Sequence, residues 1–464
     1  MKRLFIVFAV ALMCCNISCK KDPKPTPVDP PVTADDLCIT AIEPSTVAIA
    51  FYRITNSPDT TLQVTDGSYK SNIEYSHDGL QWTRFEPNVV VSLANAGDKI
   101  YLRGDNPEFL SRYDRENQAI EYTCFNMTGR VAASGNIMQL VEPSGKATEI
   151  PGPYYFYRLF DGCDALTSAP ELPATTLGDN CYGYMFNSCS SLLSSPELPA
   201  TEVSPASYAC MFRLCTGLTE AGRIHAKKVG MFGCMFMFNG CSSLVTAPII
   251  DAEEVDFQSM SFMFERCSAM TSCPDLKIKK VGKESCAMMF ARCTSLLRAP
   301  GLPVETLGRE CFLDMFYDCS SLASVPSTLP ATTLAEKCYR GMFANCSNLT
   351  TAPALPATTL AEGCYYCMFA GCSSLTSAPE LPATTLVPGC YVGMFQDCSN
   401  LSYVKALFNQ TDEELNALDE EGNRQYLGSW LLEVSPIGRF VRNAAATYNP
   451  ESAEIPEGWS VENN

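Results

Sequence analysis

The chain has 464 residues, of which 46% are hydrophobic, and it carries a formal charge of −18 at pH 7. This composition supplies enough apolar side chains for a large folded core, so it excludes a chain that is disordered throughout. Because binding to phosphates requires a basic surface, the acidic balance argues against nucleic acid as a partner.

Residues 1–18 have the pattern of an export signal: two basic residues, an apolar run, and then small or polar residues. The segment around Cys19 resembles the processing site of bacterial lipoproteins, with Cys19 as the lipidated residue. Two other cysteines, Cys14 and Cys15, are alternative acceptors, and ordinary cleavage with secretion is the alternative to a lipid anchor. We expect an exported outer-membrane lipoprotein that is exposed on the cell surface.

Residues 19–36 follow the signal and are rich in proline and polar residues. Such a composition favours an extended spacer of about 3 Å per residue rather than a helix or a central strand. No later stretch has eighteen consecutive apolar residues, so we expect membrane attachment by the lipid alone.

Residues 37–149 contain short runs of β-branched and aromatic residues separated by turn signals. This pattern predicts a small all-β sandwich of antiparallel strands. The expected strands lie at residues 38–42, 46–52, 73–76, 89–94, 99–103 and 120–124.

Residues 150–405 repeat one phrase, Met-Phe-x-x-Cys-Ser-Ser-Leu, ten times. The intervals between its cysteines are 26 residues, except for one of 27. A constant period of this size predicts stacked units, each of which covers the apolar face of its neighbour. The cysteines of the phrase are Cys163, Cys189, Cys215, Cys241, Cys267, Cys293, Cys319, Cys346, Cys372 and Cys398.

The repeat predicts both the core and the local structure of each coil. A Phe precedes every one of the ten cysteines by three residues, so Phe212, Phe238 and Phe264 are expected to touch in a file. The Leu-Thr-Ser-Ala part is expected to form a parallel ladder that proline stops after two or three residues. We expect the Cys-Tyr-x-x-Met-Phe part to form a single helical turn.

The repeated phrase resembles the BspA-like class of leucine-rich repeat, although Met replaces Ala and the period is longer. The resemblance covers about 255 residues. It implies an α/β solenoid of the leucine-rich repeat type, with ten coils of about 26 residues, on a cell surface and acting by binding. Residues 406–464 are expected to cap this solenoid, and residues 411–414 have a capping-box pattern that opens a short helix.

The 25 cysteines suggest a disulfide scaffold or a metal cluster until they are placed on the repeat period. Ten occupy one position of the phrase, and five more share a position eight residues earlier. We therefore interpret them mainly as small buried groups whose thiols hydrogen-bond weakly to the backbone. Some disulfides or a metal site are the alternatives. The single C-x-x-C pair, Cys364 and Cys367, has no second pair or histidine nearby.

Catalytic chemistry finds little support in the sequence. The two histidines, His77 and His225, have no nucleophile at a meaningful spacing, and no pair of acidic residues is marked as a glycosidase site. We expect no enzymatic activity, no cofactor and no metal.

One charge pattern marks the most divergent coils. The Thr-Thr position of the repeat changes to acidic and basic residues whose sign alternates from one coil to the next. Stacking would place these opposite charges side by side, which favours a structural role in register over a ligand site. The residues of this charge ladder are Glu202, Lys227, Lys228, Glu253, Glu254, Lys279, Lys280 and Glu305.

The sequence favours a protein that binds other macromolecules. Tyrosines at one repeated position supply a candidate binding face, unless they pack inward: Tyr182, Tyr339, Tyr365 and Tyr391. The expected partners are host or bacterial surface proteins, which indicates adhesion. Polysaccharide binding in nutrient capture is the alternative, followed by a hydrolase. We expect a monomer.

Overall fold

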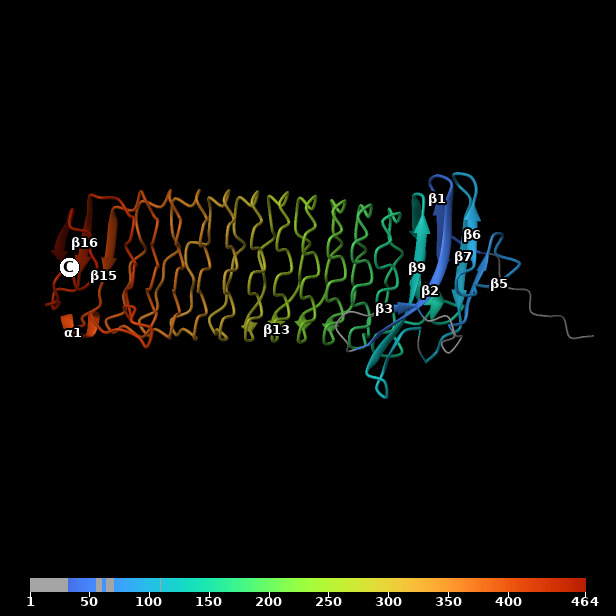
Figure 1. The fold of residues 1–464 in the computed structure, drawn as a ribbon, viewed down its shortest axis with the longest axis horizontal. Helices are drawn as coiled ribbons and strands as arrows, with labels where there is room; N and C mark the ends of the chain where they lie inside the picture. The colour runs from blue at the N-terminus through green and yellow to red at the C-terminus, as the bar shows by residue number, and fades with distance from the viewer. Residues whose placement is uncertain (1–31, 56–60, 64–70, 109) are drawn as a thin grey trace, which may run out of the picture.

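The computed structural model describes residues 32–55, 61–63, 71–108 and 110–464. Figure 1 shows a row of stacked coils with the β-rich N-terminal part at one end and the C-terminus at the other. The expected export signal, Cys19 and most of the spacer lie outside the described residues.

The N-terminal part contains two antiparallel sheets, as the sequence predicts. The first sheet has the order β10-β1-β7-β4-β5, and the second has the order β3-β2-β9-β8 with β6 paired to β2. The strands are β1 (Cys38–Ala41), β2 (Ser45–Thr55), β3 (Thr61–Gln63), β4 (Ile73–Ser76), β5 (Thr83–Arg84), β6 (Val90–Leu93), β7 (Lys99–Gly104), β8 (Arg112–Asp114), β9 (Ala119–Thr128) and β10 (Val131–Ser134).

Apolar residues of both sheets belong to one core that continues into the coils. Ile39 and Ile100 from the first sheet and Ile49 and Phe125 from the second are completely buried in this core. The six expected strands are present, but sequence reasoning missed β3, β5, β8 and β10, because these are only two to four residues long and carry weak patterns.

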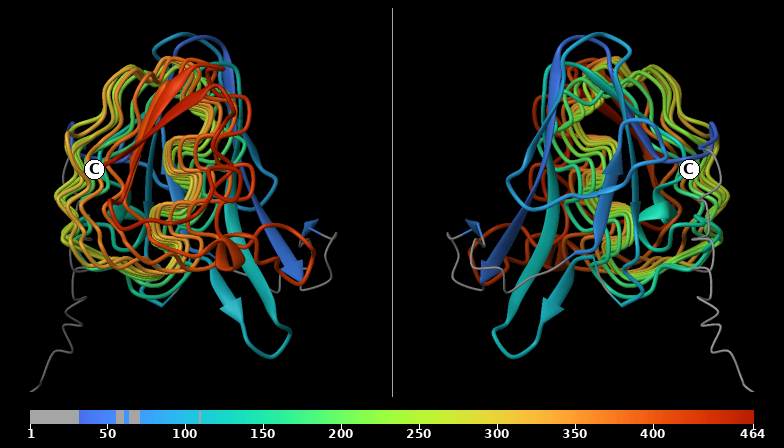
Figure 2. Two further views of the ribbon diagram at one scale, coloured as in Figure 1. Left: turned by 90° about the vertical axis from the view of Figure 1, so that its left-hand side faces the viewer. Right: turned by 90° about the vertical axis from the view of Figure 1, so that its right-hand side faces the viewer.

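The coils lie directly on top of one another, and Figure 2, viewed along the stack, shows them following one outline. The prediction for Phe212, Phe238 and Phe264 is confirmed, because their ring centroids are separated by 5.4 and 5.5 Å and the rings are nearly parallel. The whole Phe file, from Phe125 to Phe395, has centroid spacings of 5.2 to 5.7 Å.

The expected helical turn in each coil is wrong, and with it the α part of the expected α/β class. The segment forms consecutive tight turns instead, with a residue of positive φ at every fourth position, such as Ala206, Cys210 and Leu214. Alternate amides close these turns, while the others donate to the next coil, as Phe212 N does to Met237 O at 2.9 Å. An α-helix satisfies its own amides and would leave the next coil without these bonds.

The opposite side of the coils is bonded by short parallel pairs. The Leu-Thr-Ser-Ala part makes mostly isolated bridges, such as Ser194 with Glu220, because proline follows so closely. At the Thr-Thr-Leu part of the repeat, two-residue strands form in four of the divergent coils, in the order β11-β12-β13-β14. They are β11 (Glu202–Val203), β12 (Lys228–Val229), β13 (Glu254–Val255) and β14 (Lys280–Val281).

Both ends of the stack are covered by segments without the repeated phrase. At the N-terminal end, Phe125 of β9 stacks on Phe160, and β10 is followed by the short 3₁₀ helix η1 (Ile137–Leu140). At the C-terminal end, residues 425–433 continue the consecutive turns, and completely buried Trp430 stacks on Tyr391 at a centroid distance of 6.2 Å. The turn geometry therefore extends beyond the ten copies counted in the sequence.

The remaining C-terminal elements complete this cover. They are β15 (Tyr403–Ala406), α1 (Asp412–Leu415), β16 (Gly438–Arg442) and β17 (Trp459–Asn463), and the three strands form a parallel sheet. Thr411 and Glu414 form the predicted capping box at the start of α1. Within the described part of the chain, no helix has the length and hydropathy that crossing a bilayer requires.

Candidate functional site

The tyrosines expected to form a binding face are buried, so that expectation is wrong. Tyr182, Tyr339, Tyr365 and Tyr391 each have at most 2% of their surface exposed. Tyr365 stacks between the other two C-terminal tyrosines at centroid distances of 6.0 and 6.1 Å. Burial raises the pKa of Tyr365 well above its ordinary value. These rings form a second aromatic file inside the stack because the four-residue turn places them on the same side as the Phe file.

On the outward side of the consecutive turns, the side chains vary from one coil to the next. We call this side the turn face, and it runs along residues 154–163, 180–189, 206–215, 232–241, 258–267, 284–293, 310–319, 337–346, 363–372 and 389–398. One position on it, always at positive φ, holds seven types of residue in ten coils: Arg158, Tyr184, Cys210, Phe236, Phe262, Met288, Asp314, Gly341, Cys367 and Gly393. A constant frame that carries variable outward side chains is suited to recognising a partner.

An apolar patch occupies the turn face in the middle coils. Phe236 and Phe262 stack at a centroid distance of 4.6 Å, and Phe232 contacts Phe257 edge-on at 5.3 Å. None of these four rings belongs to the buried core. We define the patch as these rings together with Met231, Met235, Met288 and Leu214, which lie on the turn face of the same and the neighbouring coils. Met231 is 41% exposed and Leu214 is 38% exposed, so the patch is open to solvent.

A tyrosine cluster lies beside the N-terminal coils. Tyr122 and Tyr157 are buried, and Tyr52, Tyr154 and Tyr184 pack partly exposed around them. The guanidinium of Arg158 lies 4.6 Å from the ring centroid of Tyr184, which is a cation–π distance. Sequence reasoning missed both this cluster and the apolar patch, although the signal was available as positions where the coils depart from the common phrase.

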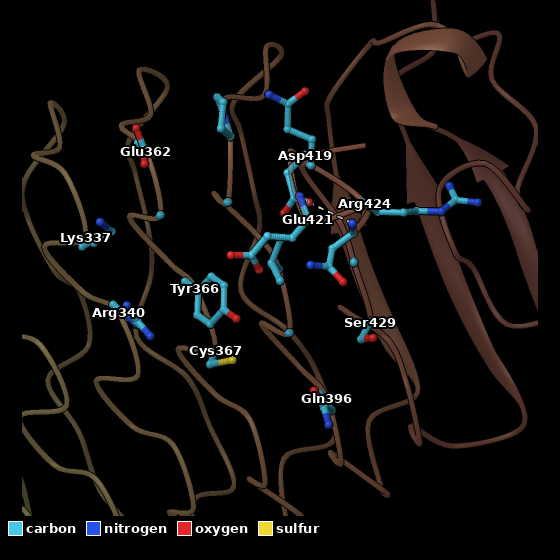
Figure 3. A pocket seen from close by; sticks show the side chains of 18 of the residues that line it. Lys337, Arg340, Glu362, Tyr366, Cys367, Gln396, Asp419, Glu421, Arg424 and Ser429 are labelled. Carbon is cyan, nitrogen blue, oxygen red and sulfur yellow. Dashed lines mark hydrogen bonds between the residues drawn. The ribbon is translucent and has the colours of Figure 1, made fainter. Parts of the chain in front are cut away.

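A groove of about 900 Å³ opens at the C-terminal end of the turn face. Figure 3 shows Lys337, Arg340 and Tyr366 on one wall and Asp419, Glu421 and Arg424 on the other. The groove exists because Gly363, Gly389 and Gly393 line it at positions where earlier coils carry side chains. All three have φ between 59° and 69°, the left-handed region in which glycine is favoured.

The cations of the groove already have partners. Lys337 Nζ lies 3.1 Å from Glu336 and 4.0 Å from Glu310, and Arg424 Nε lies 3.1 Å from Glu454. The Arg340 guanidinium lies 4.8 Å from the ring centroid of Tyr366, so both side chains share one wall.

The charge ladder lies on the other side of the coils, on β11 to β14. The parallel register pairs Glu202 with Lys228, Lys228 with Glu254, and Glu254 with Lys280. Lys279 Nζ lies 2.6 Å from Glu253, and this contact lowers the pKa of the Glu253 carboxyl, with Lys227 contributing a smaller attraction. The backbone of Lys280 forms a parallel β-bridge with Thr306 of the following coil, and Glu305 directly precedes Thr306 in the chain. The opposite charges are therefore neighbours, while the effect on register stays a prediction.

The repeat cysteines make the expected hydrogen bonds to the backbone. In all ten coils the Sγ of the phrase cysteine lies 2.9 to 3.2 Å from the carbonyl oxygen of the preceding Phe in the file. All cysteines of the described residues are free thiols, and Cys367 in the groove wall is the only one among them that is not buried. Burial raises the pKa of the Cys215 and Cys319 thiols to about 12, which makes them weak nucleophiles.

The other sequence candidates do not assemble into a site. Cys364 is buried while Cys367 faces the groove, and burial raises the pKa of both thiols. His225 lies 3.5 Å from Glu197, and His77 lies 3.3 Å from the Lys99 carbonyl oxygen. In the described ranges no three His, Cys, Asp or Glu side chains are grouped so that they could hold a metal ion.

The similarity of this chain to known proteins comes from solved structures, of which five chains match. No model of a protein family matches the chain, and no curated protein matches it. Among solved structures, a leucine rich cell surface protein from Faecalibacterium prausnitzii A2-165 is similar with a TM-score of 0.29 and 15% identity, covering 88% of this chain and 96% of the other. At this TM-score the likeness carries no structural argument.

Proposed function

We propose that the chain is a cell-surface protein whose coils form a solenoid of the leucine-rich repeat type, and that its turn face binds other proteins and so mediates adhesion. The observation that carries this proposal is the apolar patch of Phe and Met side chains on the turn face, where the Phe236 and Phe262 rings stack outside the core. Met side chains adapt to different partner shapes, and exposed aromatic rings supply contact area at low entropic cost.

Patches of exposed apolar side chains on a folded protein are typical of interaction sites. The patch crosses several coils, from Leu214 to Met288, and so favours an extended macromolecular partner over a small molecule. Lys283 Nζ lies 5.5 Å from the ring centroid of Phe257 at the edge of the patch, which provides a polar rim.

Glycan binding remains the second candidate, because aromatic rings gather on the turn face. The observation that favours it is the tyrosine cluster around Arg158. Many of these rings, however, pack on one another: Tyr52 stacks on Tyr122 at 5.4 Å and Phe236 stacks on Phe262 at 4.6 Å. A sugar ring requires a free aromatic face, so a protein partner is the better fit.

Residues 37–464, biotinylated and immobilised, test the proposal when incubated with solubilised surface proteins of candidate host or bacterial cells. We expect specific partners whose recovery falls at least several-fold with Met231→Gln/Phe236→Gln. The matched control is Leu193→Gln/Leu297→Gln, which changes two apolar side chains that are 51% and 56% exposed away from the turn face. Retention on a polysaccharide gel without any protein partner would replace the proposal by the glycan candidate.

The same proposal includes outer-membrane anchoring through Cys19, which lies outside the described residues. Metabolic labelling with an alkyne fatty acid is expected to label the full-length protein in its producing cell. Cys19→Ala is expected to abolish the label and release the protein from the membrane fraction. Persistent labelling of this variant would point to Cys14 or Cys15 instead.

A further inference from the structure

The groove at the C-terminal end of the turn face has the size and openness of a binding cleft. Its volume of about 900 Å³ lies in the range typical of ligand sites. One wall belongs to three successive coils, and the other belongs to the loop from Asp419 to Gln425. The groove is therefore formed between the last coils of the repeat and a loop of the C-terminal segment that follows them.

Glycines create this space. At the position of Gly363 and Gly389, earlier coils carry Gln258, Glu284 and Glu310, all at positive φ. A side chain is thus compatible with this backbone, and its removal in the last two coils opens the groove. At these glycines, which have no side chain, the backbone of a ligand can approach closely.

The charges in the groove are not balanced. Lys337 and Arg424 are engaged by Glu336 and Glu454. Within the described residues, no cation lies at ion-pair distance from the lining carboxylates Glu362, Glu420 and Glu421. Asp419 also lines the groove without an ion pair, so four such carboxylates face Arg340, which makes no ion pair within the described part of the chain.

From the shape and charge of this groove we infer that it binds an extended polypeptide segment that carries Lys or Arg side chains. This inference rests on the proposed function and names a second contact on the same turn face. A basic side chain in the groove could form ion pairs with the carboxylates of Glu420 and Glu421 on one wall. On the other wall it would find the partly exposed Tyr366 ring, which favours cations and the aliphatic stems that carry them.

Fluorescence anisotropy with a labelled Gly-Lys octapeptide tests the inference on residues 37–464. We expect saturable binding that weakens as NaCl is raised from about 50 to about 300 mM. Glu420→Gln/Glu421→Gln is expected to raise the Kd roughly fivefold. Glu171→Gln/Glu220→Gln, which removes the same charge from exposed positions away from the groove, is expected to leave the Kd within about twofold.

Blocking the groove without changing its charge gives an independent test. Gly363→Gln copies the side chain that Gln258 carries at the same position, and its Cβ would meet mainly the flexible Lys337 side chain. We expect it to raise the Kd roughly tenfold by exclusion, with little change in Tm. The inference would be overturned if Glu171→Gln/Glu220→Gln raised the Kd as much as Glu420→Gln/Glu421→Gln does. It would also be overturned if a Gly-Glu octapeptide bound as tightly as the Gly-Lys octapeptide.

Two further outcomes separate this inference from the proposed function. Binding of cellohexaose that Gly363→Gln abolishes, without binding of the Gly-Lys peptide, would assign the groove to a glycan and overturn the inference. Loss of partner recovery only with Met231→Gln/Phe236→Gln, and no peptide binding in the groove, would leave the proposed function standing while the inference fails.

Discussion

The thiol of Cys215 donates a hydrogen bond to the backbone carbonyl oxygen of Phe186, 29 residues earlier, at an Sγ–O distance of 3.1 Å. Phe186 belongs to the preceding coil, and its ring stacks on Phe212 of the coil that holds Cys215. One buried side chain therefore joins two coils at the position where their aromatic rings meet. This relationship recurs along the stack and explains why a thiol, small and weakly polar, occupies that position.

Removing this thiol should destabilise the fold. Cys215→Ala removes one of the two donors to the Phe186 carbonyl oxygen, which keeps its hydrogen bond from the Cys189 amide, and it creates a small void. We therefore expect the free energy of unfolding to fall by about 1–2 kcal/mol. Urea denaturation followed by circular dichroism measures the change. Cys367→Ala, at the half-buried position, is the control and should stay within about 0.5 kcal/mol of the wild type. Similar losses in both variants would contradict the role of the hydrogen bond.

The protein should lose stability in alkali. Burial raises the pKa of Cys181, Cys215 and Cys286 to about 12 in the folded chain, from an ordinary value of 9.0. Above pH 9 these thiols ionise in the unfolded chain first, so stability is fully present below pH 9 and falls as the pH rises toward 12. Between pH 9 and pH 12, each such thiol lowers the free energy of unfolding by about 1.4 kcal/mol per pH unit. Urea midpoints at pH 7, 9 and 10.5 check this, and a flat profile above pH 9 would refute it.

The two aromatic rows should respond differently to truncation. Phe238 is completely buried in the Phe file, so Phe238→Ala is expected to cost about 3–5 kcal/mol of unfolding free energy. Phe236, two residues away, lies on the turn face outside the core, and Phe236→Ala should cost much less. Thermal denaturation of both variants measures the difference. Equal costs would mean that the turn-face rings are structural and would weaken their assignment to partner binding.

Reversing one rung of the charge ladder should lower the melting temperature. Lys227→Glu/Lys228→Glu places like charges beside Glu202 and Glu254 in the parallel register. Because these side chains are exposed, the loss should shrink in high salt. Adding Glu253→Lys/Glu254→Lys is expected to restore part of the Tm by recreating one pair of opposite charges. An unchanged Tm in the first variant would show that the ladder has no role in stability.

The C-terminal cover should be required for solubility. Deleting residues 408–464 removes Trp430 and exposes the aromatic rings of Tyr391 and Phe395, which it covers. Unpaired ends of a repeat stack associate, so we expect the truncated chain to aggregate or dimerise. Size-exclusion chromatography with light scattering measures this. The milder Trp430→Ala should remain monomeric at low temperature and unfold earlier, and a soluble, monomeric truncation would contradict the capping role.

Much of the fold follows from the period of the sequence. Because equivalent residues of successive coils become neighbours, the spacing of Phe212, Phe238 and Phe264 is sufficient to predict their file, and the alternating charges are sufficient to predict which side chains meet on β11 to β14. The phrase cysteines follow from the same argument, since a small residue at a constant position of a stacked core is buried in every coil.

Only the tertiary structure decided the form of the coil and the position of its surfaces. Buried residues at Cys181, Tyr182, Met185 and Phe186 fit a helical turn as well as a four-residue tight turn, so their spacing alone does not choose between them. The tight turns form because backbone amides donate hydrogen bonds to the next coil, about 25 residues away in the chain. A local sequence pattern does not reveal such long-range hydrogen bonds. The four-residue tight turns also direct the tyrosine rings into the core and place the Phe and Met side chains of the patch on the outer surface. On the same turns, glycines leave the space that forms the groove.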